Sequence, residues 1–180
     1  MSVVACRMLK NGYEMAADSI RVHGYTQRKG NSGGAAKLTV VNDIYFGYVG
    51  CCDVGALLTV YLKNHRPEPT ELGIIEFMSE FADWKQKKVN NADVTGCDYL
   101  FGFPDSVFRF IHWGVQQITD FTAIGAGEDY ALASLHLGHT AKEAVETACE
   151  LSVYCERPVK SLTRRLKRAP AVKSETVVKG

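Results

Sequence analysis

Residues 2–19 read SVVACRMLKNGYEMAADS and contain two apolar runs, Val3–Arg7 and Tyr13–Asp18, on either side of Lys10-Asn11-Gly12. Asn-Gly between two apolar runs is a strong signal for a tight turn between antiparallel strands. The segment therefore predicts a β-hairpin at the start of the chain, with its first strand beginning at the N-terminus.

A second hairpin follows, because Asn42-Asp43 separates the apolar runs Lys37–Val41 and Ile44–Val49. The spacing of apolar residues then changes from that of strands to that of helices. Two helices are predicted here, one from Asp53, a candidate N-cap, to near Asn64 and one containing the apolar stripe from Ile74 to Trp84.

The second half of the chain repeats this order. Strands are predicted over Tyr99–Phe103, Val107–Trp113 and Ile118–Ile124, and helices over Glu128–Leu137 and from Thr140 to about Cys155. Thr140-x-x-Glu143 has the pattern of a capping box. Two blocks of strands, each followed by a helix pair, predict an α+β fold, a four-layer αββα sandwich of two antiparallel sheets flanked by helices.

The composition is that of a globular protein with one domain. The chain has 180 residues, of which 46% are hydrophobic and 23% are charged. No uncharged stretch approaches the roughly 20 apolar residues that cross a membrane, and the first residues lack the basic and apolar regions of a secretion signal. We therefore expect a cytoplasmic protein with no membrane partner.

The six cysteines should be reduced in that compartment. The chain has no Cys-x-x-Cys pair, and only His136-x-x-His139 offers closely spaced histidines. Because a zinc site needs paired ligands at short spacing, we expect no metal and no organic cofactor.

The C-terminal residues are basic. Residues 160–180 carry seven Lys or Arg and one Glu, whereas the rest of the chain carries 14 bases and 19 acids. We expect a domain over residues 1–160 and a basic tail over residues 161–180. The tail is either a solvated terminus or a contact for an anionic partner. No aromatic residue lies among its bases, which argues against nucleic-acid binding.

The motifs GxxxxGK[ST], GxGxxG and HExxH of common nucleotide-binding and catalytic sites are absent from the sequence. One candidate nucleophile remains at the start of the chain. Removal of Met1 would leave Ser2 with a hydroxyl nucleophile and a free α-amine, whose ordinary pKa of about 7.7–8.0 suits a general base. Cys6 is a rival nucleophile, but its use would require the removal of five residues.

Several segments, in the same order, resemble proteasome β-type subunits and HslV, which are N-terminal-nucleophile (Ntn) hydrolases. These segments are Ser2–Cys6, Asn11-Gly12, Ala16–Ser19, Tyr45–Gly50, Ala123–Ala131 and Thr140–Val145. The resemblance covers about residues 2–160. It implies the same αββα sandwich that the pattern of strands and helices predicts independently.

The resemblance implies a role for five residues. Ser2 would be the nucleophile, Lys37 the catalytic lysine and Asp18 its partner. The Gly50 amide would donate to the oxyanion, and Val49 would lie near the pocket for the residue before the scissile bond. The implied function is a peptidase subunit that hydrolyses unfolded polypeptides inside a ring-shaped homo-oligomer, with an unfolding ATPase or a gating partner.

Departures from the family pattern favour an alternative, a catalytically inactive shell or assembly subunit of the same fold. Ser2 replaces the usual Thr, and Ala126 stands where active members have a supporting Ser. The family's Asp-x-x-Ser or Asp-x-x-Thr segment after the long helix is not evident, and Glu150, Ser152 and Glu156 are candidates for its supporting role. Retained Met1 would also favour the alternative, since Ser2 would then have no free amine.

Overall fold

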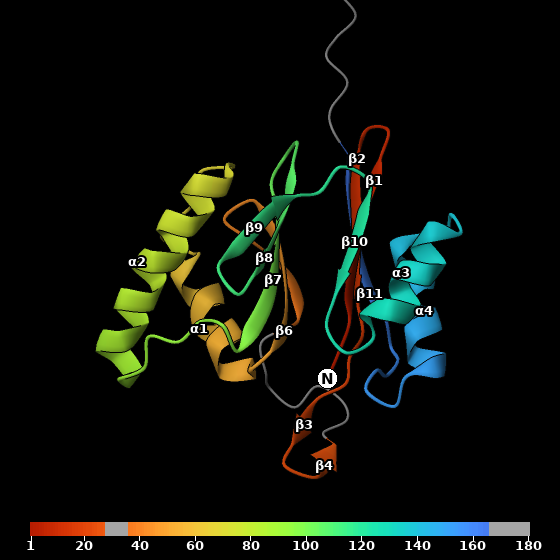
Figure 1. Ribbon diagram of the computed structural model, residues 1–180, viewed down its shortest axis with the longest axis horizontal. Coiled ribbons are helices and arrows are strands. Elements are labelled where there is room, and N and C mark those ends of the chain that lie inside the picture. The colour runs from red at the N-terminus through yellow and green to blue at the C-terminus, as the bar shows by residue number, and fades with distance from the viewer. Residues whose placement is uncertain (28–35, 166–180) are drawn as a thin grey trace, which may run out of the picture.

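Two antiparallel sheets lie face to face at the centre of the molecule in the computed structural model, which describes residues 1–27 and 36–165 (Figure 1). One sheet has the order β10-β1-β2-β11, with β1 at Val4–Leu9, β2 at Gly12–Ala17, β10 at Phe121–Ile124 and β11 at Lys160–Arg165. The other has the order β5-β6-β7-β8-β9, with β5 at Leu38–Val41, β6 at Ile44–Gly50, β7 at Cys97–Gly102, β8 at Val107–Ile111 and β9 at Gly114–Gln117. A small separate hairpin pairs β3 (Val22–His23) with β4 (Thr26–Gln27).

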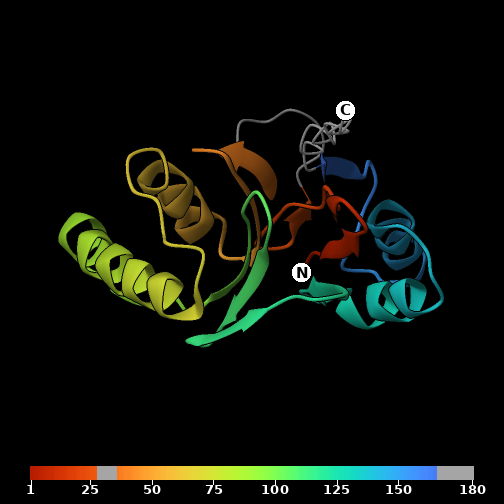
Figure 2. The same cartoon turned by 90° about the horizontal axis from the view of Figure 1, so that it is seen from above.

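Helices cover the outer face of each sheet. The five-stranded sheet carries α1 (Cys52–Tyr61) and α2 (Glu71–Val89), and the four-stranded sheet carries α3 (Glu128–His136) and α4 (Ala141–Leu151). The same four layers are seen after a turn of 90° (Figure 2). The predicted αββα sandwich is confirmed. None of the helices in the described residues is both long and apolar enough to cross a membrane.

Three hydrophobic clusters fill the three interfaces between the layers. The cluster under α1 and α2 is rich in aromatic side chains, among them Phe46, Tyr99 and Phe110. The cluster under α3 and α4 consists largely of small residues such as Ala131 and Ala144. A third cluster lies between the two sheets. Both sheets are therefore covered on both faces.

β1 is buried on both faces, which explains the uninterrupted apolar sequence at the start of the chain. Val3 and Ala5 pack in the cluster under α3 and α4, whereas Val4 and Cys6 pack between the sheets. This alternation follows from the two-residue period of a strand. The first residues of the chain are therefore anchored in the interior.

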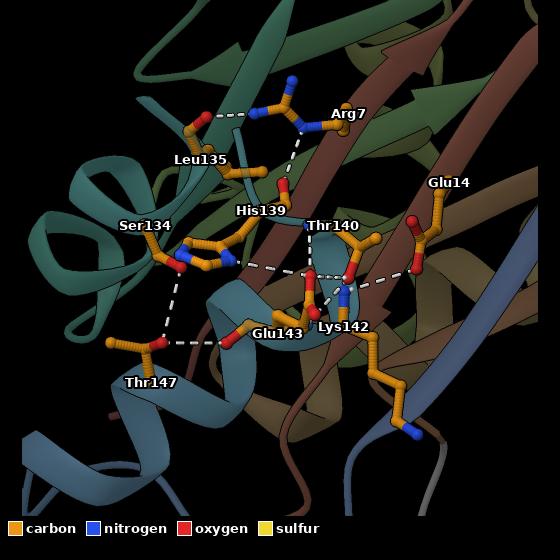
Figure 3. A network of polar contacts seen from close by, with 9 residues as sticks. All are labelled: Arg7, Glu14, Ser134, Leu135, His139, Thr140, Lys142, Glu143 and Thr147. Carbon is orange, nitrogen blue, oxygen red and sulfur yellow. Dashed lines mark hydrogen bonds and ion pairs between the residues drawn. The ribbon is translucent and has the colours of Figure 1, made fainter. Parts of the chain in front are cut away.

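Polar contacts attach α3 and α4 to the four-stranded sheet (Figure 3). Arg7 of β1 donates to the main-chain carbonyl of Leu135 and, at 2.7 Å, to that of His139. Glu14 of β2 accepts a hydrogen bond of 3.3 Å from the N–H of Lys142, in the first turn of α4. A carboxylate at this position is favourable because the first N–H groups of a helix have no partner within it.

The capping box predicted at the start of α4 is confirmed, because Thr140 and Glu143 each accept a hydrogen bond from the other's N–H. The end of the helix differs from the prediction. The helix ends at Leu151 and not near Cys155, because the residues that follow turn back and contact Asp18 after β2.

The predicted strand Val107–Trp113 is too long. β8 ends at Ile111, the chain reverses at His112 and Trp113, and β9 returns along β8. Both turn residues have positive φ, 47° and 66°. Turns of this kind usually contain Asn or Gly, so the sequence gives no signal for this one.

Other boundaries differ by a few residues. α1 follows β6 almost directly, and its N-cap is Cys51, so the predicted N-cap Asp53 lies within the first turn. β10 begins at Phe121, later than the strand predicted over Ile118–Ile124.

The folded domain extends beyond the predicted boundary at residue 160. Lys160–Arg165 form β11, which pairs with β2 at the edge of the four-stranded sheet. Arg164 forms an ion pair of 2.8 Å with Asp43, in the turn between β5 and β6. These basic residues are therefore part of the sandwich, and the remainder of the predicted tail, residues 166–180, lies outside the described residues.

Candidate active site

Two hydrogen bonds hold the peptide group that joins Ser2 and Val3. The carbonyl of Ser2 accepts from the N–H of Gly127 at 3.2 Å, and the N–H of Val3 donates to Oδ1 of Asp18 at 2.9 Å. A Cβ atom on Gly125, where φ is 99°, would lie 2.5 Å from the Ser2 carbonyl oxygen, so this close approach requires glycine. Ser2 is only 5% exposed.

Asp18 follows β2 and is the polar centre of the site. Its side chain is fully buried. Oδ1 accepts from Lys37 Nζ at 2.8 Å as well as from Val3, and Oδ2 accepts from the N–H groups of Ile20 at 3.0 Å and Glu156 at 3.2 Å. Three main-chain donors and one cation therefore compensate this carboxylate for its loss of hydration.

Lys37 precedes β5, and its carbonyl accepts from the N–H of Tyr48 at 2.9 Å, which fixes it beside β6. The residue is buried. Burial lowers the pKa of Lys37 from its usual value, while the adjacent Asp18 carboxylate opposes this shift. The site thus contains a desolvated cation held against a desolvated carboxylate.

Four of the five predicted site residues line one small pocket. They are Ser2, Lys37, Val49 and Gly50, and Asp18 lies behind Lys37. The other lining residues are Met1, Ile20, Arg21, Val22, Tyr48 and Cys52. The fold thus brings the five predicted residues together, although they are spread over 49 positions, from Ser2 to Gly50. The described parts of the chain contain no group of three or more His, Cys, Asp or Glu residues that could hold a metal ion.

The support for Asp18 from the segment after α4 differs from the predicted candidates. Glu156 contributes its main-chain N–H and not its carboxylate. Glu150 forms an ion pair with Arg157 at the surface, and the hydroxyl of Ser152 accepts from the main chain two residues later. Sequence reasoning missed the donor because a main-chain N–H leaves no signature in the residue type.

A thiol lies behind the loop that holds Ser2. A Cβ atom on Gly127 would lie 2.5 Å from Sγ of Cys155. Cys155 is buried, and its pKa is raised, first by burial and then by the charge of Asp18. Ala126, which the resemblance aligns with a supporting serine of active family members, is exposed. No pattern in the sequence predicts Cys155 at this position.

Comparison with solved structures identifies proteins with the same fold. BPH from Thiobacillus denitrificans, in complex with epoxomicin, matches with a TM-score of 0.82 and 20% identity over 92% of this chain and 99% of that one. Eukaryotic HslV from Trypanosoma brucei matches with a TM-score of 0.66 and 16% identity, over 91% of this chain and 99% of HslV. Anbu, an ancestral beta-subunit from Yersinia bercovieri, matches with a TM-score of 0.66 and 11% identity, over 91% of this chain and 81% of Anbu.

No protein-family model matches the sequence, and no curated protein matches it significantly. The structural likenesses nevertheless extend over nine-tenths of the chain. The chain therefore has the proteasome β-type and HslV-like Ntn-hydrolase fold that its sequence resemblance predicts.

Proposed function

We propose that this chain is a cytoplasmic peptidase subunit that hydrolyses peptide bonds of unfolded polypeptides with Ser2 as an N-terminal nucleophile. The observation that carries the proposal is the convergence of Ser2 and Lys37 in one pocket, with Lys37 Nζ 2.8 Å from the buried carboxylate of Asp18. The fold shared with HslV supports this assignment.

The proposed reaction begins when Met1 is removed. Ser2 Oγ attacks the carbonyl carbon of the scissile peptide bond, and the new α-amine accepts the hydroxyl proton. The ammonium of Lys37 lies in the same pocket and favours the negatively charged forms of its neighbours. The N–H of Gly50 would donate to the oxyanion, an interaction worth about 3 kcal/mol in known cases.

The backbone at Ser2 supports the removal of Met1. Ser2 has a φ of 124°, a value that is unfavourable for residues with a Cβ atom. The φ angle is defined only while a preceding residue is attached, so removal of Met1 would relieve this strain. Met1 also lines the pocket, and its loss would give a substrate more room.

We expect that the purified protein begins at Ser2 and hydrolyses fluorogenic peptides, and that Ser2→Ala lowers turnover by about 10³-fold or more. Loss of one hydroxyl should change the free energy of unfolding by less than about 1 kcal/mol. N-terminal sequencing, peptide hydrolysis and urea denaturation measure the three quantities. Ser79→Ala, on the exposed face of α2, is the matched control.

The alternative is a catalytically inactive shell or assembly subunit. Its supporting observation is Met1, which is half exposed and lines the pocket, because a retained Met1 would leave the Ser2 nitrogen as an amide with no basic lone pair. Protein that begins with Met1 and lacks hydrolysis before and after Ser2→Ala would favour this alternative.

The proposal includes a ring-shaped homo-oligomer and an unfolding ATPase or gating partner, since a nucleophile at a chain end needs a chamber that excludes folded proteins. Sedimentation of the purified protein tests the ring. Epoxomicin, which is bound to BPH in one of the similar structures, is a suitable probe of the pocket. We expect it to block hydrolysis and to leave Ser2→Ala unmodified.

A further inference from the structure

One cysteine differs from the other five in its position. Cys52 is the first residue of α1, is exposed, and lines the pocket that contains Ser2 and Lys37. Cys51 is also exposed but does not line this pocket. The remaining four, Cys6, Cys97, Cys149 and Cys155, are buried or partly buried. Cys52 is therefore the thiol that solvent-borne reagents can reach within the pocket.

A second observation indicates that this pocket receives a ligand. Ser2 is 5% exposed and lines the pocket, and its hydroxyl makes no hydrogen bond to any other described residue. An unpartnered hydroxyl facing a pocket is thus suited to bind or attack a molecule that enters it.

The charges around Cys52 favour an anionic reagent. Lys37 lies close enough to the Cys52 thiol for an electrostatic interaction, and Arg21 is a second cation on the wall of the pocket. The carboxylate of Asp18, whose Oδ1 lies 2.8 Å from Lys37 Nζ, offsets part of the positive charge of Lys37. Asp18 itself does not line the pocket. A small disulfide that carries carboxylates, such as glutathione disulfide, matches this surface.

We propose that Cys52 is a modification site at which a low-molecular-weight disulfide forms a mixed disulfide and closes the pocket. The Cys52 thiolate attacks one sulfur of the disulfide, the bond between its two sulfurs breaks, and the other half leaves as a thiolate that takes up the proton released by Cys52. The reagent is reduced and Cys52 is oxidised, so no further oxidant is needed. Excess thiol reverses the exchange.

The consequence for activity rests on the proposed function. An adduct on Cys52 would occupy the pocket beside Ser2, because both residues line it. It would therefore prevent a polypeptide from reaching the hydroxyl. The formation of the adduct itself does not depend on any peptidase activity.

The test uses the full-length protein incubated with glutathione disulfide, followed by intact-mass measurement and peptide mapping. We expect one rapid adduct at Cys52 in the wild type and in Cys51→Ser, and its loss in Cys52→Ser. Cys51→Ser is the matched control, since it removes the adjacent exposed thiol. A first adduct at Cys51, or equal rates at both cysteines, would overturn the proposal.

Hydrolysis by each variant is then compared with and without glutathione disulfide. We expect at least about a tenfold loss in the wild type and Cys51→Ser, restored by dithiothreitol, and no change in Cys52→Ser relative to its own untreated activity. Full activity of a protein modified at Cys52 would show that the adduct does not close the pocket. Absence of hydrolysis from every untreated protein would contradict the peptidase assignment, whereas the mass measurement would still decide the modification site.

Discussion

The carboxylate of Asp18 connects four segments that are distant in sequence: the start of β1, the residues after β2, the start of β5 and the segment after α4. An amide at this position would keep one acceptor oxygen but would direct an NH2 group toward main-chain N–H donors. Asp18→Asn would also leave Lys37 as a buried cation without its counter-charge. The residue therefore determines the geometry of the site and contributes to stability.

We expect Asp18→Asn to lower the free energy of unfolding by about 3–5 kcal/mol, the range for removal of one partner from a buried ion pair. Urea denaturation measures this change. Asp83→Asn, on the exposed face of α2, should change stability by less than about 0.5 kcal/mol. Equal midpoints for the two variants would show that Asp18 has no such role.

Lys37 provides a pH-dependent prediction. Burial is the main cause that lowers the pKa of Lys37 in the folded protein. At pH values between this folded pKa and the unfolded value near 10.4, the unfolded chain therefore binds more protons than the folded chain. Stability contributed by Lys37 therefore rises with pH across this window and is lost as pH falls through the folded pKa. We expect the free energy of unfolding of the wild type, relative to Lys37→Met, to increase as pH approaches 10.4. A difference that is constant or that falls with pH would contradict this sign.

The predicted site residues could be found because their side chains carry the chemistry. Ser2, Asp18 and Lys37 are polar residues at the ends of predicted apolar strands, and the resemblance gave them their order and spacing. The contributions of Gly127 and Glu156 are main-chain N–H groups. Any residue type can supply such a donor, so only the folded geometry reveals it.

Two turns of similar geometry show where element prediction succeeds and where it fails. Asn42-Asp43 and His112-Trp113 both have positive φ at both positions. Asn and Asp tolerate this conformation, and the first turn was predicted correctly. His and Trp have no such preference, so the strand was predicted to continue through the second turn. Packing of Trp113 against Phe110, with ring centroids 5.6 Å apart, helps to offset the conformational cost.

We expect His112→Asn to stabilise the protein by a few tenths to about 1 kcal/mol, because Asn adopts positive φ more readily than His. His112 is exposed, so little packing is lost. Thermal denaturation at neutral pH measures the effect. His112→Ala, which removes the same side chain without favouring positive φ, should not stabilise. A gain of similar size from Ala would assign the effect to loss of the imidazole instead.

At the scale of the whole molecule, the sequence predicted four layers because two blocks of strands are each followed by a pair of helices. Aromatic side chains fill the interface under α1 and α2, whereas alanines fill the interface under α3 and α4. The edge of the four-stranded sheet could not be predicted, because KSLTRR in β11 alternates weakly and carries three bases. Its pairing depends on β2, far away in sequence.

β11 also contacts the five-stranded sheet, in addition to forming the edge of the four-stranded sheet. Leu162 packs against the cluster between the sheets, and Arg164 lies over the ring of Tyr45, at 5.4 Å from its centroid, while it pairs with Asp43. These contacts connect β11 of the four-stranded sheet to the β5–β6 hairpin of the other sheet. The C-terminal strand therefore joins the two halves of the sandwich.

Two truncations test this role. A chain that ends at Arg165 keeps every contact that the structure describes, so we expect its free energy of unfolding to equal that of the full chain within about 0.5 kcal/mol. A chain that ends at Val159 loses the pairing of β11 with β2 and the Arg164–Asp43 ion pair. At about 1 kcal/mol for each lost main-chain hydrogen bond, it should be destabilised by at least about 3 kcal/mol. Urea denaturation measures the free energy of unfolding of the three proteins. An equal decrease in both truncated chains would place the stabilisation in residues 166–180. No decrease in either truncated chain would show that β11 is dispensable for stability.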